Sequence, residues 1–129
     1  MKDKVIITAA ITGGVHSPTM SPYLPITPKE IADEAVRTYK AGAPVCHIHA
    51  RDPETGMPSP DLNLFKEIIT SIKSHCNIVI CITTGGGAGM TVEQRLAPVK
   101  LYKPELASFN AGSINFGLFP SMDNSKIQE

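Results

Sequence analysis

Two histidines separated by one residue, His47 and His49, are the side chains of this sequence best suited to bind a metal ion. They lie in the apolar run Pro44–Ala50, which is typical of a buried strand. Because side chains alternate along a strand, both imidazoles point to one face and Ile48 points to the other. Neutral imidazoles are good zinc ligands, and a catalytic zinc ion usually has about three protein ligands and one open position. The spacing therefore predicts that the two histidines are ligands of a zinc site. A structural use of both rings is the alternative.

A glycine-rich segment follows the next apolar run of the sequence, Asn77–Thr84. Thr83, Gly85 and Gly86 lie where this predicted strand ends, and they offer a hydroxyl group and backbone N–H groups to a carboxylate or an oxyanion. The segment TTGGGAG lacks the Lys-Ser/Thr pair of a phosphate-binding loop and is not a dinucleotide fingerprint. We therefore predict that it binds a substrate anion, and a turn without a ligand is the alternative.

Other polar residues follow the ends of predicted strands. Ser108 and Asn110 are two residues apart, so they share a face and are candidates for a substrate pocket. Arg51 and Asp52 come directly after the histidines, where they could orient a ligand or bind an acid, but a structural pair or a turn is the favoured interpretation. His16 lies in a proline-rich loop that follows the first predicted strand, where it could reach the site as part of a lid or as a third ligand, although a loop histidine without a role is the favoured interpretation.

The elements that must position these residues alternate between strand and helix. Thr27, Pro28 and Glu30 form a helix start with an N-cap, a first-turn proline and a capping box. Thr91 and Gln94 form a second capping box. The predicted strands are Val5–Thr12, Pro44–Ala50, Asn77–Thr84 and Leu106–Asn110, and the predicted helices run from Thr27 to Gly42, from about Asp61 to His75, and onward from Thr91.

This alternation predicts an α/β fold with a parallel sheet, because each helix returns the chain to the same end of the sheet. Two architectures are compatible with the pattern, an open doubly wound sheet and part of a (β/α)8 barrel. A barrel needs about 250 residues, and no convincing helix follows the fourth strand. We therefore predict that residues 1–129 are the N-terminal part of a single TIM-barrel domain and cover about its first four β/α units.

Composition limits the partners. The 129 residues include 12 basic and 12 acidic side chains, which removes the electrostatic argument for nucleic acid or an anionic membrane. No apolar run approaches the roughly 20 residues of a membrane span. Met1–Lys4 leads into a strand pattern rather than a signal peptide, so a cytoplasmic location is expected. The three cysteines are expected to be reduced thiols without a disulfide.

Taken together, these motifs resemble the β-keto acid cleavage enzymes, a family that includes the 3-keto-5-aminohexanoate cleavage enzyme of lysine fermentation. The chain is similar to the N-terminal half of that family. The segments that carry the resemblance run from Ile7 to about Gly117 and are ITAAITGG, LPITPKEIADEA, AGAPVCHIHARDPETGMPS, CITTGGGAG, RLAP and ASFNAGSINFG.

The resemblance implies an oligomeric, zinc-dependent (β/α)8 barrel in which a 3-keto acid and acetyl-CoA give acetoacetate and a new acyl-CoA by a retro-Claisen mechanism. It further implies that His47 and His49 bind zinc and that Thr83, Ser108 and Asn110 contact the substrate.

The residues that would complete the site lie elsewhere. By the resemblance, a third zinc ligand, a glutamate, and the arginine and aspartate that assist proton transfer lie beyond Glu129, so no catalytic residue is assigned within this chain. Val15 stands where the aminohexanoate-cleaving type has a glutamate that meets the substrate amine. An apolar residue cannot make that contact, so the resemblance does not extend to an amine-bearing substrate.

Two other functions remain compatible with the residues. One is a metal-dependent hydrolase on a similar barrel, although its His-x-His motif usually lies on the first strand and here it lies on the second. The other is a truncated protein that binds metal or assembles with other chains, for which unpaired strand edges would be an aggregation hazard.

Overall fold

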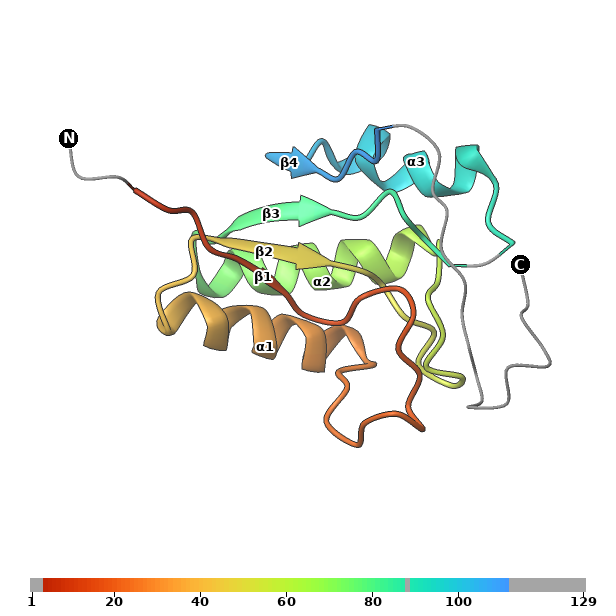
Figure 1. The fold of residues 1–129 in the computed structure, drawn as a ribbon, viewed down its shortest axis with the longest axis horizontal. Helices are drawn as coiled ribbons and strands as arrows, with labels where there is room; N and C mark the ends of the chain where they lie inside the picture. Colours follow the sequence, from red (N-terminus) through yellow and green to blue (C-terminus); the bar gives the residue numbers. More distant parts are fainter. Residues whose placement is uncertain (1–3, 88, 112–129) are drawn as a thin grey trace, which may run out of the picture.

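The computed structural model describes residues 4–87 and 89–111, which form a sheet of four parallel strands with a helix in each connection (Figure 1). The strands are short and the helices run for three to four turns. In chain order the elements are β1 (Thr8–Ala10), α1 (Pro28–Lys40), β2 (Val45–Ile48), α2 (Leu62–His75), β3 (Val79–Ile82), α3 (Val92–Tyr102) and β4 (Leu106–Ala107). The predicted α/β class is confirmed.

The order of the strands distinguishes the two predicted architectures. The strands are neighbours in sequence order, β1-β2-β3-β4, and all three pairs are parallel. A doubly wound sheet reverses its strand order at a switch point, and no reversal occurs among the described strands. Sequential parallel strands are instead the arrangement of a (β/α)8 barrel, so the chain covers about the first four units of that fold.

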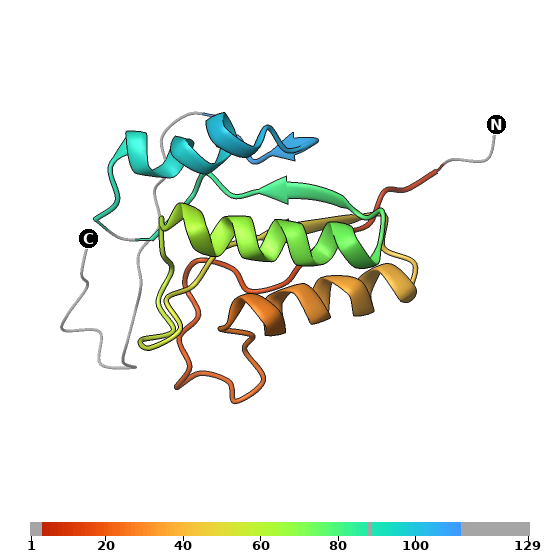
Figure 2. The same ribbon diagram turned by 180° about the vertical axis from the view of Figure 1, so that it is seen from behind.

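A single apolar core lies between the sheet and its helices, and α2 crosses one face of the sheet in the view from behind (Figure 2). Ile48 of β2 and Ile80 of β3 are fully buried in this core, whereas their strand neighbours His47 and Cys81 point to the opposite face and are half-buried. All three helices contribute to this one core, so they cover the same face of the sheet. The other face carries the histidines, as alternation along β2 predicts.

Local sequence explains where the helices begin. At α1, Thr27 accepts a hydrogen bond from the N–H of Glu30, and the Glu30 carboxylate accepts one from the N–H of Thr27. Thr91 and Gln94 form the same reciprocal pair at α3, so both predicted capping boxes are confirmed. Asp61 caps α2.

The first strand differs from its prediction. Val5–Thr12 was expected to be a strand buried on both faces, but only Thr8–Ala10 pairs with β2, and Ile6 is 74% exposed. The physical reason is that β1 is an edge strand of the described sheet, so one side of it has no neighbour there. In the described part of the chain no helix is long and apolar enough to cross a membrane.

Candidate functional site

The two predicted ligands meet at the carboxyl end of β2. The Nε2 atoms of His47 and His49 lie 3.2 Å apart, and the two rings are arranged edge to face with centroids 5.1 Å apart. His47 lies on the strand itself, whereas His49 follows it and is only 7% exposed. The alternation that predicted a shared face for the two rings thus gives converging nitrogen atoms.

Burial keeps both imidazoles neutral. Burial lowers the pKa of His47. Burial is also the main cause that lowers the pKa of His49 to about 4, with smaller contributions from the neighbouring His47 and Arg51 side chains. At neutral pH each ring therefore has one nitrogen with a free lone pair. A metal ion binds this neutral form, because protonation removes the lone pair.

The pair fits one zinc ion as part of a larger ligand set. Two nitrogens bound at about 2.0 Å to a tetrahedral zinc ion lie about 3.3 Å apart, and the observed separation of the Nε2 atoms is 3.2 Å. Among residues 4–87 and 89–111, no cluster of three or more His, Cys, Asp or Glu side chains is placed to hold a metal. Within the described residues, the imidazole pair would therefore supply two of the about three protein ligands that a catalytic zinc ion usually has.

Two neighbours of the histidines were not identified from the sequence. The thiol of Cys81 on β3 lies 3.3 Å from Nδ1 of His47, because the sheet register pairs these two residues. Gly14 lies beside His49, where a Cβ atom would stand 3.2 Å from Cε1 of the ring and 2.8 Å from the carbonyl oxygen of Gly86. The register between β2 and β3, had it been known, would have indicated Cys81 as a neighbour of His47. No local signal in the sequence indicates that Gly14 lies beside His49.

The glycine-rich segment is held in shape from both ends. The N–H of Gly85 donates to the hydroxyl of Thr83 over 3.0 Å. On the other side, the guanidinium of Arg95 in α3 donates to the carbonyl oxygens of Gly85, Gly87 and Met90. Among the residues that the structure describes, the N–H of Gly86 has no acceptor. The loop thus directs carbonyl groups to Arg95 and keeps an N–H group available.

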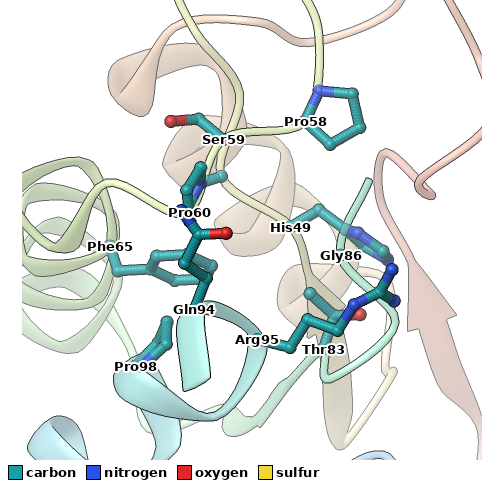
Figure 3. A pocket seen from close by; sticks show the side chains of 11 residues that line it. His49, Pro58, Ser59, Pro60, Phe65, Thr83, Gly86, Gln94, Arg95 and Pro98 are labelled. Carbon is teal, nitrogen blue, oxygen red and sulfur yellow. The ribbon is translucent and has the colours of Figure 1, made fainter. Parts of the chain in front are cut away.

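His49, Thr83 and Gly86 line one small cavity together with residues of α2 and α3 (Figure 3). Figure 3 shows Arg95 extending from α3 along the glycine-rich loop. The cavity holds about 10 Å³, which is about the space of one water molecule. A cavity of this size does not hold a ligand much larger than a water molecule.

Ser108 and Asn110 are placed differently from each other. The hydroxyl of Ser108 accepts a hydrogen bond from the N–H of Thr84 over 2.8 Å, and the carbonyl of Ser108 accepts one from the Thr84 hydroxyl. Asn110 is exposed and makes no hydrogen bond within the described residues. The contact of Ser108 therefore links the ends of β3 and β4, and neither side chain lines the small cavity.

Arg51 and Asp52 do not form the pair that their adjacency suggested. Asp52 is a turn residue whose carboxylate accepts hydrogen bonds from the N–H groups of Glu54 and Thr55, and these bonds lower its pKa. Arg51 is fully buried and bonds to backbone carbonyl groups instead. The favoured interpretation of Asp52 as a turn element thus agrees with the structure.

The fold and the imidazole pair define a (β/α)-barrel protein with its candidate site at the carboxyl ends of the strands. The family model for the beta-keto acid cleavage enzymes matches residues 4–128. This chain belongs to that family, as its motifs predicted.

Two curated relatives illustrate the similarity. The protein of Paraburkholderia graminis named 3,5-dioxohexanoate:acetyl-CoA acetone transferase is 51% identical over 125 residues, which cover 97% of this chain and 40% of the relative. The 3-keto-5-aminohexanoate cleavage enzyme of Acetoanaerobium sticklandii is 45% identical over 129 residues, which cover 97% of this chain and 46% of the relative. The chain thus spans less than half the length of these relatives.

A solved structure supports the fold. The binary complex of ObcA with oxaloacetate is 29% identical to this chain, with a TM-score of 0.60, and the match covers 69% of this chain and 24% of the ObcA chain. The ternary complex of ObcA with a C4-CoA adduct and oxalate gives a TM-score of 0.58 at 27% identity.

Proposed function

We propose that this chain carries half of the active site of a zinc-dependent β-keto acid cleavage enzyme. In the proposed reaction the C2–C3 bond of a 3-keto acid breaks and its two-carbon carboxylate end joins the acetyl group of acetyl-CoA as acetoacetate. The remaining acyl group leaves on CoA, so all atoms are accounted for. The observation that carries the proposal is the buried, neutral pair of imidazoles with Nε2 atoms 3.2 Å apart, in a chain of this family.

His47 and His49 are the residues proposed to hold zinc. When bound, zinc would act as a Lewis acid that polarises the keto oxygen of the substrate. The two histidines contribute position, because one lies on a strand of the sheet and the other is buried directly beyond it. Cys81 supports this arrangement by its contact with Nδ1 of His47, since the partner of the outer ring nitrogen fixes the orientation of a metal-binding imidazole.

Thr83, Gly85 and Gly86 are proposed to bind the substrate carboxylate. The Thr83 oxygen already accepts a bond from the N–H of Gly85, so its hydroxyl proton remains available for donation. The N–H of Gly86, which has no acceptor among the described residues, is proposed as a second donor. His49, Thr83 and Gly86 surround one small cavity. A carboxylate that accepts both bonds would lie beside His49 at the edge of this cavity, and the rest of the keto acid would extend over the open face of the sheet. Ser108 would act indirectly, by holding the end of β3 through Thr84.

The 3-keto acid is proposed to have an uncharged tail such as that of 3,5-dioxohexanoate. Val15 is apolar and 50% exposed, in the loop beyond β1, where it offers no charge to an ammonium group. The P. graminis relative named for 3,5-dioxohexanoate is 51% identical to this chain, against 45% for the aminohexanoate cleavage enzyme of A. sticklandii. With this substrate the products would be acetoacetate and acetoacetyl-CoA.

The test is turnover of a panel of 3-keto acids by the complete protein that contains this segment, in the presence of zinc and acetyl-CoA. We expect 3,5-dioxohexanoate to give acetoacetate and acetoacetyl-CoA in equal amounts. We also expect it to be preferred over 3-keto-5-aminohexanoate by about tenfold or more, because one charge-assisted contact is worth about 1.5–3 kcal/mol. The absence of acetoacetate with every keto acid of the panel would contradict the proposed reaction. A preference for the amine-bearing acid would contradict only the proposed substrate.

A further inference from the structure

The loop beyond β1 is fixed by a buried arginine that has no carboxylate partner among the described residues. Arg51 is 0% exposed, and none of the ion pairs of residues 4–87 and 89–111 includes it. A buried charge without a counterion is costly unless dipoles surround it. A buried charge placed beside the imidazole pair therefore calls for a specific geometric role.

Four backbone carbonyl groups surround the guanidinium. One terminal nitrogen donates to the carbonyl oxygens of His16 (2.9 Å) and Gly56, and the other donates to those of Thr12 (3.2 Å) and Gly13 (2.8 Å). Three of these acceptors lie in the segment 12–16 beyond β1, and the fourth lies in the turn that follows β2. The same turn touches the loop beyond β1 again, where Gly56 packs so tightly on Pro18 that a Cβ atom would come within 2.3 Å of it.

The segment that Arg51 holds is the one that packs against His49. Gly14 lies between the carbonyl groups that Arg51 binds on either side, and it is so close to the His49 ring that a Cβ atom there would stand 3.2 Å from Cε1 and 3.4 Å from Nδ1. On the same ring, Nε2 is bonded to Cε1 and lies 3.2 Å from Nε2 of His47. A shift of the segment would therefore free the His49 ring to rotate away from its partner.

We propose that Arg51 is a positioning residue, whose buried guanidinium ties the segment 12–16 to the turn at Gly56 and so holds Gly14 against the imidazole of His49. A lysine cannot replace it, since an ammonium group has three donors on one atom whereas the planar guanidinium reaches four carbonyl groups through two nitrogens. Its link to a metal site rests on the proposed function, but the anchoring of the loop does not.

The test compares Arg51→Lys with the control Arg37→Lys, an exposed arginine on α1 that is 76% exposed and pairs with Glu34. In the complete protein, amide hydrogen exchange of residues 12–16 should become at least about tenfold faster in Arg51→Lys, with α1 and α2 unchanged. Calorimetric titration of the metal-free protein with zinc should give a Kd about 10-fold to 100-fold higher. The control should change neither quantity.

The titration separates positioning from folding, because lost structure lowers the number of binding sites whereas lost positioning raises the Kd of the sites that remain. Unchanged exchange in residues 12–16, or fewer sites at an unchanged Kd, would overturn the inference. If Arg51→Lys does not fold, the variant Gly14→Ala serves instead, because it should displace the same segment while Arg51 is intact. The inference then requires that Gly14→Ala raise the Kd for zinc to a similar extent. If the unmodified protein binds no zinc, the proposed metal site fails, and the exchange measurement alone decides this inference.

Discussion

At the scale of single residues, the site depends on imidazoles that stay neutral. A histidine that is 7% exposed beside a second imidazole and a buried guanidinium cannot take up a proton without leaving that charge poorly solvated. The same burial that would favour metal binding therefore makes the metal-free protein sensitive to acid.

The first prediction is this acid sensitivity. In the unfolded chain His49 titrates near its ordinary pKa of 6.5, whereas in the folded protein its pKa is about 4. Between these values the unfolded state binds more protons than the folded state. The contribution of neutral His49 to the free energy of unfolding is therefore complete above pH 6.5 and is lost as the pH falls toward 4. The loss attributable to this group is about 1–3 kcal/mol.

Urea unfolding of the metal-free complete protein at a series of pH values measures this effect. The His49→Gln variant should show a smaller fall in stability over the same range, because it removes the group that titrates. An identical pH dependence in the variant and the unmodified protein would contradict the assignment of the effect to His49.

At the scale of elements, the helices are determined by short stretches of sequence. The capping boxes at Thr27 and Thr91 each satisfy backbone N–H groups that a helix start otherwise leaves without partners. Since every atom of such a box lies within four consecutive residues, its effect on stability is local.

The second prediction concerns these boxes. Thr27→Ala and Thr91→Ala should each lower the free energy of unfolding by about 1 kcal/mol. The control is Thr70→Ala, which removes the same atoms from an exposed position inside α2 and should be neutral or slightly stabilising. Chemical denaturation of the three variants measures the difference, and equal effects at all three positions would show that capping does not determine where these helices begin.

Elements were predictable from sequence to the extent that their signals are local. Both capping boxes, the class of the fold and the shared face of His47 and His49 follow from spacing alone. Contacts between loops do not follow from spacing, because they join residues far apart in the chain. The carbonyl groups that accept from Arg51, for example, lie up to 39 residues away. For the same reason Gly14 carried no sign of its closeness to His49, and the adjacency of Arg51 and Asp52 suggested a pair that the structure does not contain.

At the scale of the whole molecule, the described sheet has two outer strands. Among the described strands, β1 pairs only with β2, and β4 pairs only with β3. Near these edges lie exposed apolar side chains, among them Ile6 (74% exposed), Ile7 (61%) and Leu106 (47%). Unpaired edges with apolar side chains are surfaces that pair with other chains.

The third prediction is that residues 1–129, produced as a separate polypeptide, associate with themselves. Sedimentation velocity should show species larger than a monomer, and Ile6→Lys should reduce them, because a charge at a sheet edge opposes pairing. A polypeptide that remains monomeric at about 100 μM, where aggregation-prone species associate, would contradict the prediction.

The central claim at every scale is that His47 and His49 together hold a catalytic zinc ion. The most direct test is the zinc content of the complete protein, purified without added metal and measured by elemental mass spectrometry. We predict about one zinc ion per chain in the unmodified protein and almost none in His49→Ala. The control His75→Ala alters an exposed histidine at the end of α2 and should also contain about one zinc ion per chain. Full zinc content in His49→Ala would contradict the claim.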